Sequence, residues 1–309
     1  YLSRMAAKTD ADIIVFAGVF FMAQTAKIIS PDKKVLLPNP NSGCVMANMI
    51  NEEQLKEFKA KHPNLPTVCY VNSTAEIKAL CDICCTSANA VEIIKNLNTE
   101  EVLFVPDTHL GKWSEYKLGN TKVITYPGFC PTHLKITKED VISAREKYPE
   151  ADILIHPECH IEVSKLADYV GSTSGIMNYV KNSDKKSFVI GTEQGVVDRL
   201  KRDFPDKELI PIKDELEIAR LYLEMEKLCH KDNLDWEIEA EDGIENFLIC
   251  KFTLQPFLEN SILHGISSGT PAVFISIHVL YGDDTVVISI EDNGAGMDSE
   301  TLAQLRHAI

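Results

Sequence analysis

The chain of 309 residues is long enough for two or three domains, and its 45% hydrophobic and 25% charged residues are typical of a soluble globular protein. A net charge of −15 argues against nucleic acid or an anionic membrane as the main partner, and no apolar run approaches the length of a membrane span. Nine cysteines without a secretory leader indicate a reducing cytoplasm rather than a disulfide scaffold.

Up to about residue 210, the pattern predicts an α/β fold. Helix-compatible segments such as LSRMAAKTDA, AVEIIKNLN and KEDVISAREKY alternate with short apolar runs. Runs of this kind are typical of parallel strands buried on both faces. The expected strands are ADIIVFAG, KKVLLP, PTVCYVNS, EVLFVPD, ADILIHPE and SFVIGTE.

A weak internal repeat divides this part into three similar units, at about residues 1–65, 66–150 and 151–211, with the first and third incomplete. Asp12, Asp82 and Asp168 each precede a short strand, which small residues and then a helix follow. Each unit would offer a strand C-terminal end and a helix N-terminus, where open sheets bind anionic ligands. The centre shared by the units is the expected site.

Cys44 lies in the turn-rich stretch NPNSGCVMANM, before the expected helix VMANMINEEQLKEFKAKH. A single cysteine here can be a small buried hydrophobe. It can also be a metal or cluster ligand, because the N–H groups of a helix start lower the pKa of a thiol. Both interpretations stay open on local sequence alone.

Polar side chains gather at the predicted strand ends and helix starts. Each can be a cap, a core polar group or a turn residue, but together they indicate a site. They are Tyr70, Asn72, Ser87, Cys130, His156, Glu158, Ser172 and Thr173.

Many motifs in order resemble the quinolinate synthase family over residues 1–211. They include YVNSTAEIKA, CCTSANAVEII, PDTHLG, HPEC, VGSTSG and TEQGVVDRLKRDFPDKE. The resemblance implies a [4Fe–4S] cluster held by one cysteine from each of three similar domains, with one iron left open. Cys44 and Cys130 match the first two ligands. The cysteines of the local C-x-x-C-C match none and are expected to be core residues: Cys81, Cys84 and Cys85.

The resemblance also implies an activity and site roles. The family condenses iminoaspartate with dihydroxyacetone phosphate in cytoplasmic NAD biosynthesis, with L-aspartate oxidase as a functional partner. Glu158, His156 and Tyr70 match catalytic positions. The substrate-holding positions are Tyr70, Asn72, Ser87, His156, Glu158 and Thr173.

Two departures from the family pattern affect this expectation. The family's third cluster cysteine has no match, because Cys229 and Cys250 lack its surrounding motif. The family's early His, Tyr and Ser would lie before Tyr1. We therefore expect a weakly held cluster and little turnover from this chain.

From residue 213 the pattern changes. KDELEIARLYLEMEKLCHKD predicts an amphipathic helix with Leu221, Met225 and Leu228 on one face. LICKFTLQPFLENSILHGI predicts a second helix with Pro256 near its start. AVFISIHV and TVVISIEDNGAGM predict two antiparallel strands around a YGDD turn.

This tail, residues 212–309, resembles part of the ATP-binding domain of a sensor histidine kinase of the LytS-like kind. Asn260 matches the family's magnesium-binding asparagine, while Asp292, Gly294 and Gly296 match its adenine-binding box. EDNGAGM alone is equally typical of a strand followed by a glycine turn. A second interpretation of the chain is therefore an ATP- and Mg²⁺-binding signalling module on a vestigial synthase scaffold. A third is that the junction near residues 210 to 214 arises from a gene rearrangement or an assembly error, with no evolved joint function.

Overall fold

The computed structural model describes residues 2–213, 215–230, 233–241, 253–267, 272–282, 285–294 and 296. The chain forms two compact units, one of residues 1–196 with 200–212 and the other of residues 197–199 with 213–309. Among the described residues, no helix is both long and apolar enough to cross a membrane.

The first unit begins with a small parallel sheet. In it, β1 pairs directly with β2, and the core of Ile14, Phe16, Ala23 and Ala26 packs against it. The two strands and the first two helices predicted here are present. The elements are α1 (Leu2–Lys8), β1 (Ile13–Val15), α2 (Phe20–Ile29), β2 (Lys34–Leu36) and η1 (Ala47–Met49).

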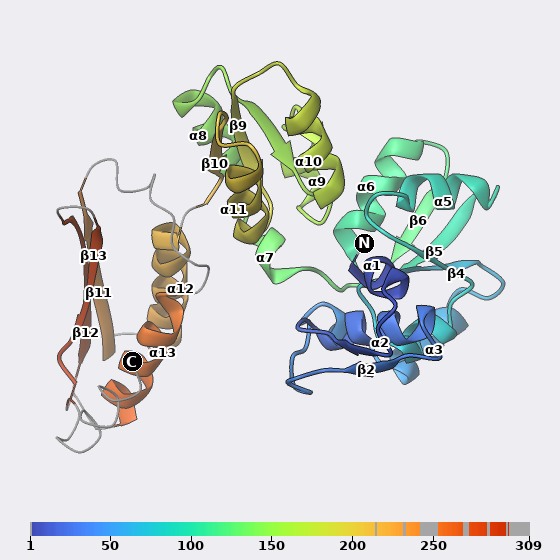
Figure 1. Ribbon diagram of the computed structural model, residues 1–309, viewed down its shortest axis with the longest axis horizontal. Coiled ribbons are helices and arrows are strands. Elements are labelled where there is room, and N and C mark those ends of the chain that lie inside the picture. The colour runs from blue at the N-terminus through green and yellow to red at the C-terminus, as the bar shows by residue number, and fades with distance from the viewer. Residues whose placement is uncertain are drawn as a thin grey trace. The chain divides into compact units, whose positions relative to one another are not determined.

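A four-stranded parallel sheet follows, in the order β4-β3-β5-β6, and Figure 1 shows it beside its own helices. Its central strands β3 and β5 are buried on both faces, as their uninterrupted apolar sequences predict. The elements are α3 (Glu52–Ala60), β3 (Thr67–Tyr70), α4 (Ala75–Ala79), β4 (Ile83–Cys85), α5 (Ala90–Asn96), β5 (Glu101–Val105), α6 (Thr108–Leu118) and β6 (Lys122–Thr125).

The third sheet is also parallel and repeats the same order, β8-β7-β9-β10. The prediction of a parallel α/β fold is confirmed. The expectation that the third unit is incomplete is wrong for its sheet, which has as many strands as the second. The elements are α7 (Pro131–Leu134), α8 (Lys138–Lys147), β7 (Asp152–Ile155), α9 (Ile161–Ser164), β8 (Tyr169–Val170), α10 (Thr173–Asn182), β9 (Ser187–Gly191), α11 (Gln194–Asp203) and β10 (Glu208–Pro211).

The repeated aspartate has the same anchoring role in these two sheets. Asp82 Oδ2 accepts a hydrogen bond of 2.7 Å from the backbone N–H of Thr67, at the start of the neighbouring strand. Lys59 donates from the preceding helix to the carbonyl of Leu80, two residues before the aspartate, at 2.7 Å. The aspartate therefore ties an edge strand to the central strand.

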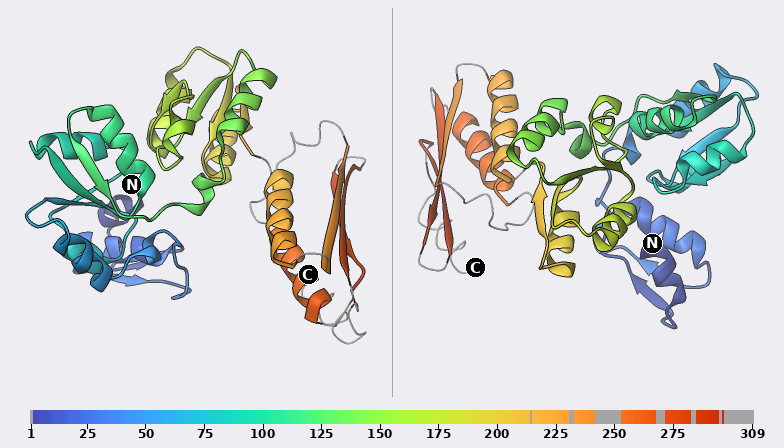
Figure 2. Two further views of the ribbon diagram at one scale, coloured as in Figure 1. Left: turned by 180° about the vertical axis from the view of Figure 1, so that it is seen from behind. Right: turned by 90° about the horizontal axis from the view of Figure 1, so that it is seen from above.

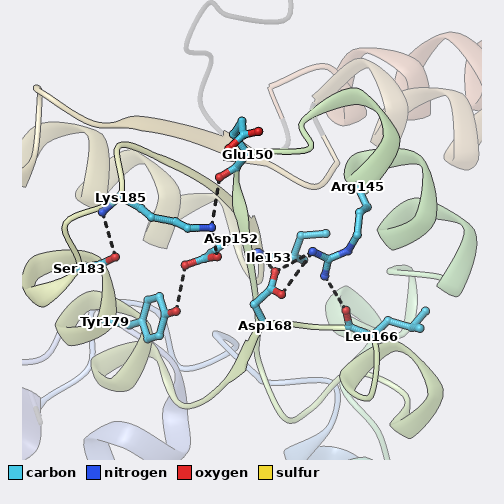
Figure 3. Close-up of polar contacts among 9 residues, drawn as sticks. All are labelled: Arg145, Glu150, Asp152, Ile153, Leu166, Asp168, Tyr179, Ser183 and Lys185. Atoms are coloured by element: carbon cyan, nitrogen blue, oxygen red, sulfur yellow. Dashed lines mark hydrogen bonds and ion pairs between the residues drawn. The ribbon is translucent and has the colours of Figure 1, made fainter.

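Asp168 repeats this arrangement in the third sheet, as Figure 3 shows. Its Oδ2 accepts a hydrogen bond of 2.8 Å from the N–H of Ile153. Arg145 takes the place of Lys59, donating to the carbonyl of Leu166 at 2.9 Å and pairing with Asp168 Oδ2 at 3.0 Å. The aspartates seen in the sequence repeat are thus structural in these two sheets.

The second compact unit is a three-stranded sheet with α12 and α13 on one face, visible in both views of Figure 2. The predicted antiparallel pair is confirmed by β12 and β13, whereas β11, a strand that we did not predict, pairs parallel with β12. The elements are α12 (Glu215–His230), β11 (Leu234–Ala240), α13 (Gln255–Ser267), β12 (Val273–Tyr281) and β13 (Val286–Asp292).

The buried face of α12 also differs from the prediction. Ala219 and Leu223 are buried in the core of this unit, whereas Met225 is 54% exposed. The side chains of Leu221 and Leu228 lie outside the described residues. Pro256 is the second residue of α13, where its missing N–H costs no helical hydrogen bond, as predicted.

Candidate functional site

The C-terminal ends of two central strands bring the main site residues together. Tyr70 is the last residue of β3, and His156 and Glu158 follow directly after β7. All three side chains are buried, each with 4% of its surface exposed. Carboxyl ends of parallel strands are the usual ligand-binding edge of α/β sheets, as the sequence pattern predicted.

Glu158 is the centre of this cluster. Its Oε1 accepts a hydrogen bond of 2.6 Å from the hydroxyl of Tyr70. Its Oε2 lies 3.1 Å from Nδ1 of His133, a contact between two side chains that are each 5% exposed. The rings of His133 and His156 stack with their centroids 4.7 Å apart. The carboxylate is therefore enclosed by groups that can donate protons to it.

His156 is a neutral imidazole. Its Nδ1 accepts a hydrogen bond of 3.3 Å from the backbone N–H of Glu158, which leaves the ring proton on Nε2. Burial lowers the pKa of His156 to about 4, although the charge of Glu158 opposes this shift. At neutral pH the ring can therefore donate a hydrogen bond through Nε2 without carrying charge.

Glu158 itself is ionised. Burial alone would raise the pKa of its carboxyl, but His156, His133 and the Tyr70 hydroxyl together outweigh that effect and lower the pKa. The pKa of Tyr70 is raised well above its ordinary value, first by burial and then by the Glu158 charge. The pair is thus a carboxylate facing a neutral phenol.

His133 is a site residue that we did not predict from the sequence. It lies three residues after Cys130 in α7, and its Nε2 is 3.0 Å from the Thr192 hydroxyl. The Nδ1 atom of His133 is buried and lies 3.1 Å from Glu158 Oε2, but the two groups are not aligned for a hydrogen bond. The C-x-x-H spacing of CPTH was the available signal, because such spacing is common among metal ligands.

The side chains here fit a metal group. Cys130, His133 and Glu158 each offer one ligand atom, and these atoms all lie within 4.8 Å of one another. A thiol, an imidazole and a carboxylate suit iron or zinc. Burial, followed by the charge of Glu158, raises the pKa of Cys130 to about 12. A bound cation would reverse that charge effect and favour the thiolate.

Cys44 lies half-buried in the same region, and both it and Cys130 pack against the core that contains Tyr70. We expected the helix start to lower the pKa of Cys44, and this prediction is wrong. Burial raises it, and the N–H groups of Ala47 and Met46 only partly oppose the rise. The long helix expected after Cys44 is also interrupted: η1 ends at Met49, and Asn51 caps α3 through the Gln54 N–H at 2.9 Å.

The other predicted substrate residues differ in their environments. The Ser87 side chain lies close enough to the Tyr70 hydroxyl to oppose the rise in the Tyr70 pKa, so it lies beside the cluster. It lies in the loop before α5, which begins at Ala90, so the expectation that it opens the helix is wrong. Asn72 is half-buried just beyond β3, and Thr173 is an exposed residue at the start of α10.

Asp107 is a second residue that the sequence analysis missed. Its Oδ1 accepts a hydrogen bond of 2.6 Å from the Leu110 N–H and so caps α6. Its Oδ2 is buried and has no hydrogen-bond partner among the described residues. Burial and then the charge of Glu158 raise its pKa well above the ordinary value. Its position after β5, in PDTHLG, was the signal.

In the second compact unit, the predicted nucleotide residues lie on α13 and at the end of β13. Asp292 Oδ2 accepts a hydrogen bond of 2.8 Å from Ser261, the neighbour of the exposed Asn260. Asp292 Oδ1 accepts another of 2.9 Å from the Gly294 N–H. Gly296 has φ of 70°, a left-handed conformation that favours glycine. Cys250 and the side chain of Cys229 lie outside the described residues.

Comparison with known proteins identifies the family. Residues 1–243 match the family described as quinolinate synthetase A protein. The quinolinate synthase of Dehalococcoides mccartyi (strain CBDB1) is 49% identical over 220 residues, which cover 71% of this chain and 72% of the relative. Those of Alkaliphilus metalliredigens and Thermodesulfovibrio yellowstonii are 52% and 49% identical, covering 67% and 69% of this chain and 68% and 70% of the relatives. The chain therefore belongs to the quinolinate synthase family, enzymes of NAD biosynthesis.

Proposed function

We propose that this quinolinate synthase condenses iminoaspartate with dihydroxyacetone phosphate at the buried site formed by Tyr70, Glu158 and their neighbours. The observation that carries the proposal is the 2.6 Å hydrogen bond from the Tyr70 hydroxyl to Glu158 Oε1. This hydrogen bond connects the ends of strands in two different sheets, and Cys130 and His133 lie beside it. Iminoaspartate is an oxidation product of aspartate, so an L-aspartate oxidase is the expected supplier.

A [4Fe–4S] cluster would be held by Cys44 and Cys130, with His133 and Glu158 beside it. When bound, such a cluster supplies a Lewis-acidic iron. The thiols suit it because both are at least half-buried and lie close enough to Glu158 for its charge to raise their pKa values. Neutralising that charge with bound iron would stabilise the deprotonated ligands.

The protein side chains supply the proton transfers and the orientation. Glu158 is the general base, because it is ionised and enclosed at hydrogen-bonding distance from Tyr70. His156 donates through Nε2 to a substrate oxygen, a role that suits its neutral form. The hydroxyl and amide groups orient a small polyanion by hydrogen bonds: Tyr70, Asn72, Ser87 and Thr173.

The test is anaerobic measurement of quinolinate formation by the reconstituted full chain and by Glu158→Gln. Loss of the general base should lower kcat by about 10²–10⁴-fold. Glu162→Gln is the matched control, since Glu162 is exposed and pairs only with Lys165 at 2.9 Å in the described contacts. Activity in Glu158→Gln equal to that of the control would reject the assigned base.

Substrate binding gives a second readout that does not depend on turnover. Calorimetry with a dicarboxylate reports binding without chemistry, and Asn72→Ala should weaken it relative to Glu162→Gln. Binding that is unchanged by Asn72→Ala and by Thr173→Ala would contradict the proposed substrate site.

A second candidate function concerns the C-terminal unit, which we propose binds ATP with Mg²⁺. What supports it is the 2.8 Å hydrogen bond between Ser261 and Asp292, because it brings the helix carrying Asn260 to the strand end before Gly294. A carboxylate can accept from an adenine amino group, and an amide oxygen suits Mg²⁺. Calorimetry should show weak Mg·ATP binding that Asp292→Asn abolishes and Glu291→Gln preserves. Equal binding by both variants would reject this site.

A further inference from the structure

A group of thiols lies in the second sheet, on the face opposite the Tyr70 side chain. Cys69 in β3 is fully buried and its thiol donates to the Tyr70 carbonyl at 3.4 Å, while the thiols of Cys81 and Cys84 lie close enough to affect its pKa. Cys84 is exposed and Cys81 is half-buried. The expectation that the C-x-x-C-C cysteines are core residues is right for Cys85, which is buried, and in part for Cys81, which packs against the core of Cys69, but it is wrong for the exposed Cys84.

The strand register places two of these cysteines directly opposite each other. Cys69 pairs with Cys84 in the parallel ladder between β3 and β4. Neighbouring strands lie roughly 4.8 Å apart, so directly paired Cα atoms fall within the 4.4–6.8 Å range of disulfides. Paired residues of neighbouring strands also point to the same face, whereas Cys85 points to the other face, into the core that contains Tyr70.

We propose that Cys69 and Cys84 are a modification site, at which a low-molecular-weight disulfide such as oxidised glutathione converts the two thiols into an internal disulfide. Cys84 is the entry point because it alone of the pair is exposed. The bond would fasten β3, which ends in Tyr70, to β4, which leads to Ser87. The redox state of the pair would thus act on the strands that carry the synthase site.

The chemistry proceeds in two exchanges. The Cys84 thiolate attacks one sulfur of the glutathione disulfide, forms a mixed disulfide and releases one glutathione thiolate, which takes up the proton. The Cys69 thiolate then attacks Cys84 Sγ, closes the Cys69–Cys84 bond and releases the second glutathione. Two protein thiols are oxidised and one glutathione disulfide is reduced to two glutathione molecules.

Two properties of the site set its rate. The neighbouring Cys81 thiol and burial raise the pKa of Cys69 to about 12, while Cys84 partly opposes the rise. Cys69 and burial raise the pKa of Cys84 as well, so little of either thiolate exists at neutral pH. The closing step is therefore slow and should accelerate as the pH rises. Parallel strands also hold paired Cβ atoms somewhat farther apart than the mean disulfide spacing, so closure must draw the two strands together.

Mass spectrometry of the native full chain can detect the bond. Trypsin cuts after Lys61, Lys78 and Lys95, which separates peptide 62–78, containing Cys69, from peptide 79–95, containing Cys81, Cys84 and Cys85. After anaerobic incubation with oxidised glutathione and alkylation of the remaining thiols, we expect the two peptides to be linked. A thiol reductant should separate them. Stable glutathione on Cys84 without any link would overturn the proposal.

Substitutions identify the partner of Cys69. Cys84→Ser should abolish the link, while Cys81→Ser, the matched control, should keep it. Should Cys84→Ser fail to fold, prior alkylation of the exposed Cys84 in the native chain must prevent the link instead. A link that survives either treatment of Cys84 would show that Cys81 or Cys85 is the partner and would reject the assigned pair.

Discussion

Glu158 accepts a 2.6 Å hydrogen bond from the hydroxyl of Tyr70, a residue 88 positions earlier in the chain. The bond spans two sheets of the same strand order, so the base of the proposed reaction comes from one repeat and its hydroxyl partner from the other. Activity should therefore depend on residues of both repeats.

Tyr70→Phe tests the hydroxyl. A hydrogen bond to a charged group contributes about 1.5–3 kcal/mol, so its loss should lower kcat by roughly 10- to 100-fold. Tyr116→Phe is a suitable control, because Tyr116 is 55% exposed on α6. Anaerobic steady-state assays of quinolinate formation measure both. Equal rates for the two variants would contradict a role for the Tyr70 hydroxyl.

The free energy of unfolding should decrease as the pH is lowered, because His156 becomes protonated. Its pKa is about 4 in the folded chain, below the ordinary 6.5, so the unfolded chain binds more protons between these values. The stability contributed by the neutral ring is complete above about pH 6.5 and is lost as the pH falls toward 4, by an amount on the order of 3 kcal/mol. Urea unfolding at several pH values measures it.

The same pH series has an internal check. The pKa of Glu158 is lowered, so its stabilising effect is present above the ordinary carboxyl range and is lost below it, at a lower pH than that of His156. His156→Gln should flatten the slope between pH 6.5 and 4 and should also reduce the loss at lower pH, because the charge of His156 is one cause of the lowered Glu158 pKa. An unchanged slope in this variant would show that another group titrates there.

Iron binding should depend on the two proposed cluster thiols. Cys44→Ala and Cys130→Ala should each lower the iron and sulfide content of the anaerobically reconstituted chain, because two half-buried thiols are the proposed ligands. Cys85→Ala is the control, since its side chain lies in the core. Iron content that is unaffected by both ligand substitutions would argue that other residues hold the metal.

The repeated aspartate anchor predicts a stability effect outside the site. Asp168→Asn should destabilise the chain by about 1–3 kcal/mol, because Asp168 Oδ2 accepts from the Ile153 N–H and pairs with Arg145. Asp206→Asn, which removes only an exposed pair with Lys186, should cost less than about 0.5 kcal/mol. Chemical denaturation compares them, and equal costs would contradict the anchor.

Strand prediction succeeded where the apolar run was long, and the repeated aspartate marked the short edge strands β4 and β8, but three other edge strands were not predicted. β3, β5, β7 and β9 are buried on most of their length, so their sequences are uninterrupted apolar runs. β6 and β10 have one fully buried residue each, and β11 alternates between polar and apolar residues. Such edge strands are defined by the neighbour they pair with, which local sequence does not contain.

The sequence by itself determined the family, the alternation of strands and helices, and the polar residues at the strand ends, because these depend on local composition and on ordered motifs. Only the tertiary structure decided which of those residues meet. The contact of His133 with Glu158, the neutral form of His156, the raised pKa of Cys44 and the pairing of Cys69 with Cys84 all follow from packing between distant segments. Burial and neighbouring charge set a pKa, and strand register sets which thiols are adjacent, so neither can be read from spacing along the chain.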